Sequence, residues 1–105
     1  MIDIKGWEGL YAITSCGKLW SYRRKRFLYP YVQNGYQLVT LCDKGRYRQT
    51  SIHQLVAETY VPKQRPEQNQ VHHKDRVHHH NWANNLEWMT AKEHALHHDA
   101  LHIFS

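Results

Sequence analysis

The sequence predicts an α+β fold in which a β-rich module at residues 1–50 precedes a unit of strand, loop, strand and helix within residues 51–105. Three observations support this class. Hairpin patterns fill the first half, a helical period begins after residue 51, and two short strand patterns followed by a helix lie near the end. A chain of 105 residues has the size of one small domain, or of two sub-modules that share a core.

Two β-hairpins are predicted in the first half. The stretch LYAITSCGKLWSY, residues 10–22, has β-branched and aromatic residues on both sides of a turn in which Gly17 can adopt a positive φ. The stretch YQLVTLCDKGRYRQTSI, residues 36–52, repeats this signal with Gly45 in the turn. We therefore expect the first half to be mostly β-strand.

A helix is predicted next, in SIHQLVAETYV, residues 51–61. Ser51 is the expected N-cap, Gln54 completes a capping box, and Pro62 ends the helix. The polar loop at residues 62–70 contains two prolines and is the clearest break between sub-modules. One helical face collects Ile52, Leu55, Val56 and Thr59.

The second half continues as strand, loop, strand and helix. The first strand is QVHH, residues 70–73, and a long polar loop follows it. In NLEWMT, residues 85–90, inward-facing and outward-facing side chains should alternate as in a half-buried strand, with Trp88 in the core. A capping box of Thr90 and Glu93 then opens a helix that we expect to continue to about residue 99.

The positive charge is concentrated in the first half of the chain. The formal net charge is +5, and residues 1–52 contain nine Lys or Arg against three Asp or Glu. In YRRKRFLY, residues 22–29, four consecutive cations are flanked by aromatic rings, a composition suited to phosphate contacts, although a solvated loop is an equally good interpretation. The candidate contact residues are Arg23, Arg24, Lys25, Arg26, Arg46 and Arg48.

Several protein classes are disfavoured by composition. No apolar run approaches the roughly 20 residues that span a bilayer, so we expect no membrane role. The N-terminus lacks the pattern of a secretory signal, and we expect a cytoplasmic location. Cys16 and Cys42, the two cysteines, are too far apart for a C-x-x-C pair, which excludes a four-cysteine zinc ribbon.

Histidines dominate the second half, since nine of the ten lie between His72 and His102. Adjacent residues of a strand point to opposite faces, so His72 and His73 should have different roles. One of them can share a metal ion with His94, and the other can act beside the metal as a base. Two imidazole ligands would leave open positions for water and phosphate oxygens.

Other histidines have simpler interpretations. His97 and His98 would share a helical face with His94, and His102 is expected at the surface. The three loop histidines at residues 78–80 are expected to face solvent or touch phosphate rather than bind metal.

The motifs HHKD at residues 72–75, NNLEW at 84–88 and TAKEH at 90–94 together resemble the HNH endonucleases of the homing type, whose nuclease unit is a ββα-metal fold. The stretch IHQLVAETYV at residues 52–61 is similar to the helix that precedes this unit. Residues 4–22, IKGWEGLYAITSCGKLWSY, resemble a small modular DNA-binding motif found ahead of such nucleases. The resemblance thus covers nearly the whole chain.

The resemblance implies a role for each matched residue. His73 would be the general base, and Asn85 the central asparagine that holds the loop so that His73 is correctly oriented. His72 and His94 would be metal ligands, Asp75 would brace the loop, and His97 would be a phosphate contact. One divalent cation is implied, first Mg²⁺ or Mn²⁺. Because His72 replaces the family's Asn or Asp, a softer ion such as Zn²⁺ or Ni²⁺ is the alternative.

The implied activity is metal-assisted hydrolysis of phosphodiester bonds in double-stranded DNA, with one strand cut per active site. A double-strand break would require a homodimer. The implied setting is a phage or mobile element in the cytoplasm of a bacterial or phage-infected cell. Two alternatives remain open: a non-catalytic DNA-binding module with a structural zinc held by His72, His94 and His98, and a protein that binds or cuts RNA.

Overall fold

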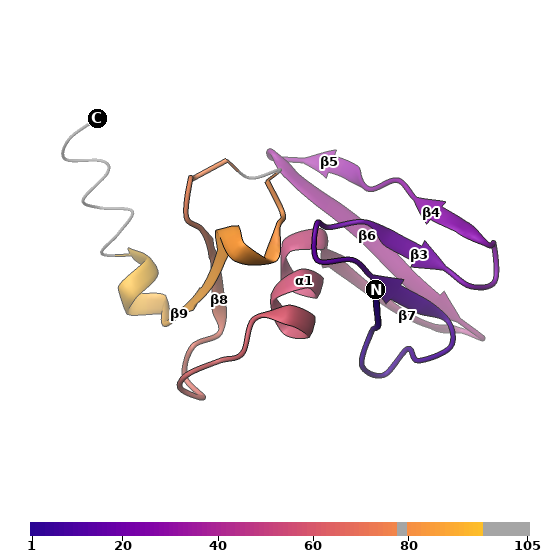
Figure 1. The fold of residues 1–105 in the computed structure, drawn as a ribbon, viewed down its shortest axis with the longest axis horizontal. Helices are drawn as coiled ribbons and strands as arrows, with labels where there is room; N and C mark the ends of the chain where they lie inside the picture. Colours follow the sequence, from indigo (N-terminus) through magenta and orange to yellow (C-terminus); the bar gives the residue numbers. More distant parts are fainter. Residues whose placement is uncertain (78–79, 96–105) are drawn as a thin grey trace.

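A computed structural model describes residues 1–77 and 80–95, and within these residues the strands form three antiparallel sheets around one helix of nine residues (Figure 1). The first sheet has the order β1-β2-β3-β4. Its hairpin between β2 and β3 is the first predicted one, and Gly17 in its turn has a φ of +88°. The strands are β1 (Ile2–Asp3), β2 (Tyr11–Ile13), β3 (Leu19–Ser21) and β4 (Arg26–Leu28).

The second sheet contains the other predicted hairpin. Its strands are β5 (Tyr31–Gln33), β6 (Tyr36–Asp43) and β7 (Arg46–Ser51), in the order β5-β6-β7. The last pair of the β6–β7 register leaves a two-residue turn, in which Lys44 has a φ of 48° and Gly45 a φ of 82°. Positive φ at both central residues is the conformation that matches the twist of a tight hairpin.

Helix α1 (Ile52–Tyr60) follows β7 directly. Ser51 caps it as predicted, because its Oγ accepts a hydrogen bond from the Gln54 backbone N–H at 3.3 Å. The other half of the expected capping box differs, since the Gln54 side chain donates to Glu58 at 3.5 Å. The helix stops before Pro62, where the Val61 N–H closes the last turn.

The third sheet pairs β8 (Gln70–His73) with β9 (Leu86–Met89), and a short 3-10 helix η1 (Ala83–Asn85) leads into β9. Residues 91–95 are helical. Their capping box is complete, because the Glu93 N–H donates to the Thr90 Oγ1 at 3.1 Å and the Thr90 N–H donates to the Glu93 carboxylate at 3.3 Å. The expected continuation to residue 99 lies outside the described residues.

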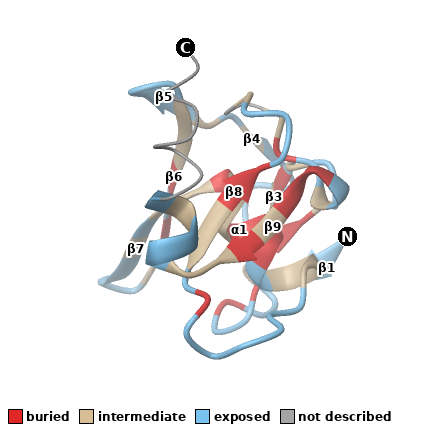
Figure 2. Cartoon of the chain, turned by 90° about the vertical axis from the view of Figure 1, so that its left-hand side faces the viewer, coloured by how far each residue is buried: buried red, intermediate tan, exposed pale blue. Residues whose placement is uncertain are grey.

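One hydrophobic core joins all these parts, and Figure 2 shows buried segments on α1, β3, β8 and β9. The core crosses the expected module boundary at residue 50. The Tyr60 hydroxyl donates to the Ile13 carbonyl at 2.7 Å, and the Ala83 N–H donates to the Ser15 carbonyl at 2.8 Å. The largest fully buried side chains are Ile13, Leu19, Leu41, Ile52, Leu55, Val56 and Leu86.

The α+β class is confirmed, with the β-rich part first and the strand, loop, strand and helix unit after α1. None of the helices within residues 1–77 and 80–95 has the length and apolar character needed to cross a membrane.

Candidate active site

His72 and His73, at the end of β8, have different surroundings, as the alternation of strand side chains predicts. The ring of His72 packs edge-on against His94, with centroids 5.9 Å apart. The ring of His73 packs edge-on against His53 of α1 at 5.0 Å, and Tyr36 lies 6.5 Å away. Both strand histidines are buried.

His73 is also part of a hydrogen-bonded chain that the sequence did not reveal. Its Nε2 lies 2.7 Å from the Asn81 Oδ1, and the Asn81 Nδ2 donates to the Gln37 Oε1 at 2.9 Å. Asn81 is 2% exposed, and a Cβ at Gly17 would lie 2.9 Å from its carbonyl oxygen. Asn81 therefore needs glycine at this point of the β2–β3 turn. No sequence signal links Gln37, which is distant in the chain, to the histidines.

Asn85 holds the loop between β8 and β9. Its Oδ1 accepts from the Asp75 N–H at 3.2 Å, and its Nδ2 donates to the Asp75 carboxylate at 3.0 Å and to the His80 carbonyl at 2.8 Å. Asp75 in turn accepts from the Val77 N–H at 2.9 Å, and its other oxygen lies 2.6 Å from the His80 Nδ1. This geometry fits the loop-holding role that the resemblance implies for Asn85, and the bracing role implied for Asp75.

These hydrogen bonds hold the pKa of the Asp75 carboxyl far below its ordinary value. The largest cause is the contact with His80, followed by the Val77 backbone N–H. The lowered pKa favours the charged form of the Asp75 carboxylate. The His80 ring also stacks on Trp82, with centroids 4.6 Å apart. The His80 side chain therefore contacts other residues of the same loop, Asp75 and Trp82.

The His72 and His94 pair is a donor set suited to a divalent cation, because imidazole nitrogen is a common ligand of transition metals. His72 and His94 are therefore the two residues that would hold such an ion, because their rings are in contact. Among residues 1–77 and 80–95, no group of three or more His, Cys, Asp or Glu side chains is arranged to hold a metal. His97 and His98 lie outside the described residues, as do His78, His79 and His102.

An open cleft of about 670 Å³ is lined by ring partners of His72 and His73, although these two buried histidines do not line it themselves. Tyr36 and His53 line it together with His94, and Gln54 and Val71 complete the wall near them. The cleft thus connects the β5–β6 hairpin with the ββα unit.

Three of the six candidate cations in the first half are engaged within the chain. Arg23 pairs with Asp43 at 2.8 Å, and Arg48 pairs with a glutamate of α1 at 2.5 Å. The guanidinium of Arg46 lies over the Trp7 ring, 4.0 Å from its centroid. These side chains support the fold and are less available to a ligand.

The other three cations are exposed. Over the described part of the chain, no ion pair includes Arg24, Lys25 or Arg26. Arg24 and Arg26 line a groove of about 410 Å³ together with Tyr29 and Tyr31. Tyr29 is 92% exposed, so a ring beside two free cations is available for stacking.

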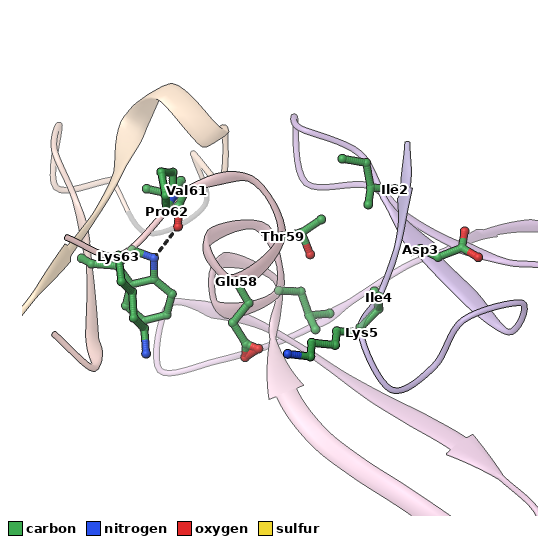
Figure 3. Close-up of a pocket in the computed structure, with 11 residues that line it drawn as sticks. Ile2, Asp3, Ile4, Lys5, Glu58, Thr59, Val61, Pro62 and Lys63 are labelled. Carbon is green, nitrogen blue, oxygen red and sulfur yellow. Dashed lines mark hydrogen bonds between the residues drawn. The ribbon is translucent and has the colours of Figure 1, made fainter. Parts of the chain in front are cut away.

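A separate cleft of about 450 Å³ lies between β1 and α1, and no histidine lines it. Figure 3 shows Ile2, Ile4 and Lys5 on one side of it, with Glu58 and Thr59 of α1 on the other. Trp88 also lines it, donating from its indole N–H to the Val61 carbonyl at 2.7 Å. Trp88 is buried, as predicted for a core residue.

Comparison with known proteins gives the class of this fold. No family model matches the chain. The uncharacterized HNH endonuclease L245 of Acanthamoeba polyphaga mimivirus is 38% identical over 91 residues, which are 84% of this chain and 27% of the relative. The DNA endonuclease I-HmuI of Bacillus phage SP01 is 32% identical over 91 residues, 86% of this chain and 52% of the relative.

The solved structure of DNA binding and cleavage by the HNH homing endonuclease I-HmuI superposes with a TM-score of 0.83 and 29% identity. It covers 93% of this chain and 56% of that one. The similarity to HNH endonucleases therefore extends over most of this chain, and the resemblance found in the sequence is confirmed. The chain spans about a quarter to about half of the length of these relatives.

Proposed function

We propose that the chain is a metal-dependent DNA endonuclease that hydrolyses phosphodiester bonds in duplex DNA. The observation that carries this proposal is the geometry at the end of β8. There a buried His73 stands next to His72, which faces His94 across the first turn of the following helix. A general base next to one of two cation ligands forms a minimal hydrolytic site.

His73 acts as the general base in this proposal. It takes a proton from the attacking water, whose oxygen forms a new bond to phosphorus while the bond from phosphorus to the 3′ oxygen breaks. The 3′ oxygen then takes a proton from solvent, leaving a 3′-hydroxyl and a 5′-phosphate. Asn85 is a positioning residue, because it holds the loop that follows His73.

His72 and His94 hold the divalent cation in this proposal. When bound, the cation supplies positive charge that offsets the charge growing on the phosphate and on the leaving oxygen. Mg²⁺ and Mn²⁺ are the first candidates. The two imidazole ligands also suit Zn²⁺ or Ni²⁺, because imidazole is a softer donor than the carboxylate and carbonyl oxygens that magnesium prefers.

Duplex DNA is the proposed partner. Arg24, Lys25 and Arg26 offer exposed cations to its phosphates, whereas Arg23, Arg46 and Arg48 contribute mainly through their contacts in the fold. His97 is proposed as a further phosphate contact. One active site per chain cuts one strand, and a homodimer would be required for a double-strand break.

The relatives belong to a phage and to a mimivirus. We therefore infer that the protein acts on DNA in the cytoplasm of an infected cell.

The test is conversion of supercoiled plasmid by the purified chain with Mg²⁺, Mn²⁺, Ni²⁺ or Zn²⁺. The proposal predicts open circles that EDTA prevents, and linear product only later. An absence of open circles with every metal, although the protein binds DNA in a mobility shift, would contradict it. Adding duplex DNA, single-stranded DNA or RNA as competitor identifies the preferred substrate.

The second candidate is a DNA-binding module with a structural zinc on the same His72 and His94 pair. It predicts that chelation unfolds the protein, because the binding energy of a structural zinc is folding energy. The nuclease proposal predicts that chelation stops cleavage while the far-UV circular dichroism is unchanged, since the core of α1, β3 and β9 contains no metal ligand.

A further inference from the structure

Asn81 lies between His73 and Gln37 of strand β6. Asn81 contacts the His73 Nε2 through its Oδ1 at 2.7 Å, and its Nδ2 donates to the Gln37 Oε1 at 2.9 Å. His73 and Asn81 are 4% and 2% exposed, so the contact between them is shielded from water. Polar groups that are buried in this way need hydrogen-bond partners within the protein.

The two ends of the Asn81 amide have opposite character, since one end accepts and the other donates hydrogen bonds. When Gln37 presents its oxygen, Asn81 must turn its NH₂ group toward Gln37 and its oxygen toward His73. The His73 Nε2 must then donate. A neutral imidazole carries one proton, so the His73 Nδ1 is the nitrogen left with a lone pair.

The β2–β3 turn fixes the position of Asn81 but does not determine which end of its side-chain amide faces His73. The β2–β3 turn packs behind it, where a Cβ at Gly17 would lie 2.9 Å from the Asn81 carbonyl oxygen and 3.0 Å from its Cβ. The neighbouring Ala83 N–H is bonded to the Ser15 carbonyl of the same turn at 2.8 Å. The place of the amide is therefore set by the turn, and the end of it that points away from His73 is hydrogen-bonded to Gln37.

We propose that Gln37 is a positioning residue that acts through Asn81 to fix the His73 tautomer with its proton on Nε2, leaving Nδ1 as the base. The inference rests on the proposed function of His73 and extends the active site into the β-rich half. Strand β6, in the module assigned to DNA binding, then also controls the catalytic group. A disturbance of the β5–β6 hairpin would reach His73 through this pair of hydrogen bonds.

The direct test measures the tautomer of His73 in the full chain, without DNA or metal. Long-range ¹H–¹⁵N spectra at about pH 8.5, where imidazoles are neutral, distinguish a protonated Nε2 from a protonated Nδ1. The His73 signals are those missing from the spectrum of His73→Gln. We expect the proton on Nε2, and a proton on Nδ1 in the unaltered chain would overturn the inference.

Three substitutions at Gln37 distinguish an effect on the orientation of the Asn81 amide from an effect on the packing around residue 37. Gln37→Glu can only accept and should keep the tautomer. Gln37→Lys can only donate, so it should turn the Asn81 amide around and move the His73 proton to Nδ1. Gln37→Met can do neither and should give a mixture of the two tautomers. Thermal unfolding followed by circular dichroism shows whether each variant is folded.

The same variants should differ in cleavage. We expect Gln37→Lys to lower kcat roughly tenfold to a hundredfold with little change in KM, as outer-shell partners and tautomer-setting groups do elsewhere. Gln37→Glu should retain activity within a few-fold. A folded Gln37→Lys with an unchanged tautomer would overturn the inference, and if that variant does not fold, an unchanged tautomer in Gln37→Met would do so.

These outcomes are distinguishable from failure of the proposed function. The tautomer is read without any cleavage assay, so a protonated Nε2 that depends on Gln37 supports the hydrogen-bonded chain even when no metal yields cleavage. Cleavage that survives in His73→Gln would overturn the role of His73 as the base, and with it the catalytic part of this inference.

Discussion

The rings of His72 and His94 are in edge-to-face contact, with centroids 5.9 Å apart and planes inclined at 71°, although one belongs to β8 and the other to the helix after β9. The β8–β9 register creates this relationship. Gln70 pairs with Met89, so the residues that follow β9 turn back beside the start of β8. Neither histidine would have this partner without the pairing of the two strands.

The first prediction concerns these two histidines as cation ligands. His94→Ala should lower the affinity for a divalent cation by roughly tenfold or more and should abolish metal-dependent cleavage, because a single imidazole ligand then remains. Isothermal titration with Mn²⁺ or Zn²⁺ measures the affinity. Lys92→Ala, an exposed substitution on the same helix, is the matched control and should bind metal normally.

The second prediction concerns the exposed cations beside the aromatic groove. Replacing Arg24, Lys25 and Arg26 by Ala should weaken duplex binding without changing the melting temperature by more than a few degrees. The slope of log K against log salt should fall by about 0.9 for each phosphate that is no longer neutralised. Lys5→Ala removes an exposed cation from a different cleft and should leave the slope as it was. An equal effect of both changes would mean that the groove does not bind DNA.

Asn85 gives the third prediction. Asn85→Ala leaves the Asp75 N–H and the His80 carbonyl without their partner, which should lower the free energy of unfolding by about 1–3 kcal/mol. Cleavage should fall further than stability alone explains, because the loop follows His73 directly. Urea unfolding measures the first effect, and exposed Asn84→Ala should show neither.

The fourth prediction concerns pH. The Asp75 carboxyl has a lowered pKa in the folded chain, with His80 as the main cause, so its charged form stabilises the fold. This contribution is fully present above the unfolded value of 3.8 and is lost as the pH falls below it toward the folded pKa. The stability difference between the unaltered chain and Asp75→Asn should therefore shrink as the pH is lowered below about 4. A difference that does not change with pH would show that the Asp75 contacts do not depend on its charge.

Much of the fold could be predicted because local signals dominate it. The turns at Gly17 and Gly45, the Ser51 cap and the box of Thr90 and Glu93 are short-range features, and each is present. Strands β4 and β5 were not predicted individually. They have three residues each, and most of their side chains are exposed, so no alternating burial pattern marks them.

The sequence predicted those site residues that lie at fixed spacings within one motif, and it did not predict the others. His72, His73, His94 and Asn85 lie within one motif, so their assembly follows from the strand, loop, strand and helix order. Gln37 could not be found in this way, because its link to His73 depends on how β6 packs against the loop. The ion pair of Arg23 with Asp43 could not be predicted either, because the number of charges in a stretch of sequence does not distinguish a paired arginine from a free one.

His73 is proposed as the base of a nuclease site, and its substitution is the decisive experiment. The most direct measurement compares the unaltered chain with His73→Ala in plasmid conversion and in a DNA mobility shift, both with the metal that supports cleavage best. We expect open circles to disappear in the variant while DNA affinity changes less than about threefold, because the exposed cations are untouched. Cleavage by a folded His73→Ala variant at an unchanged rate would contradict it.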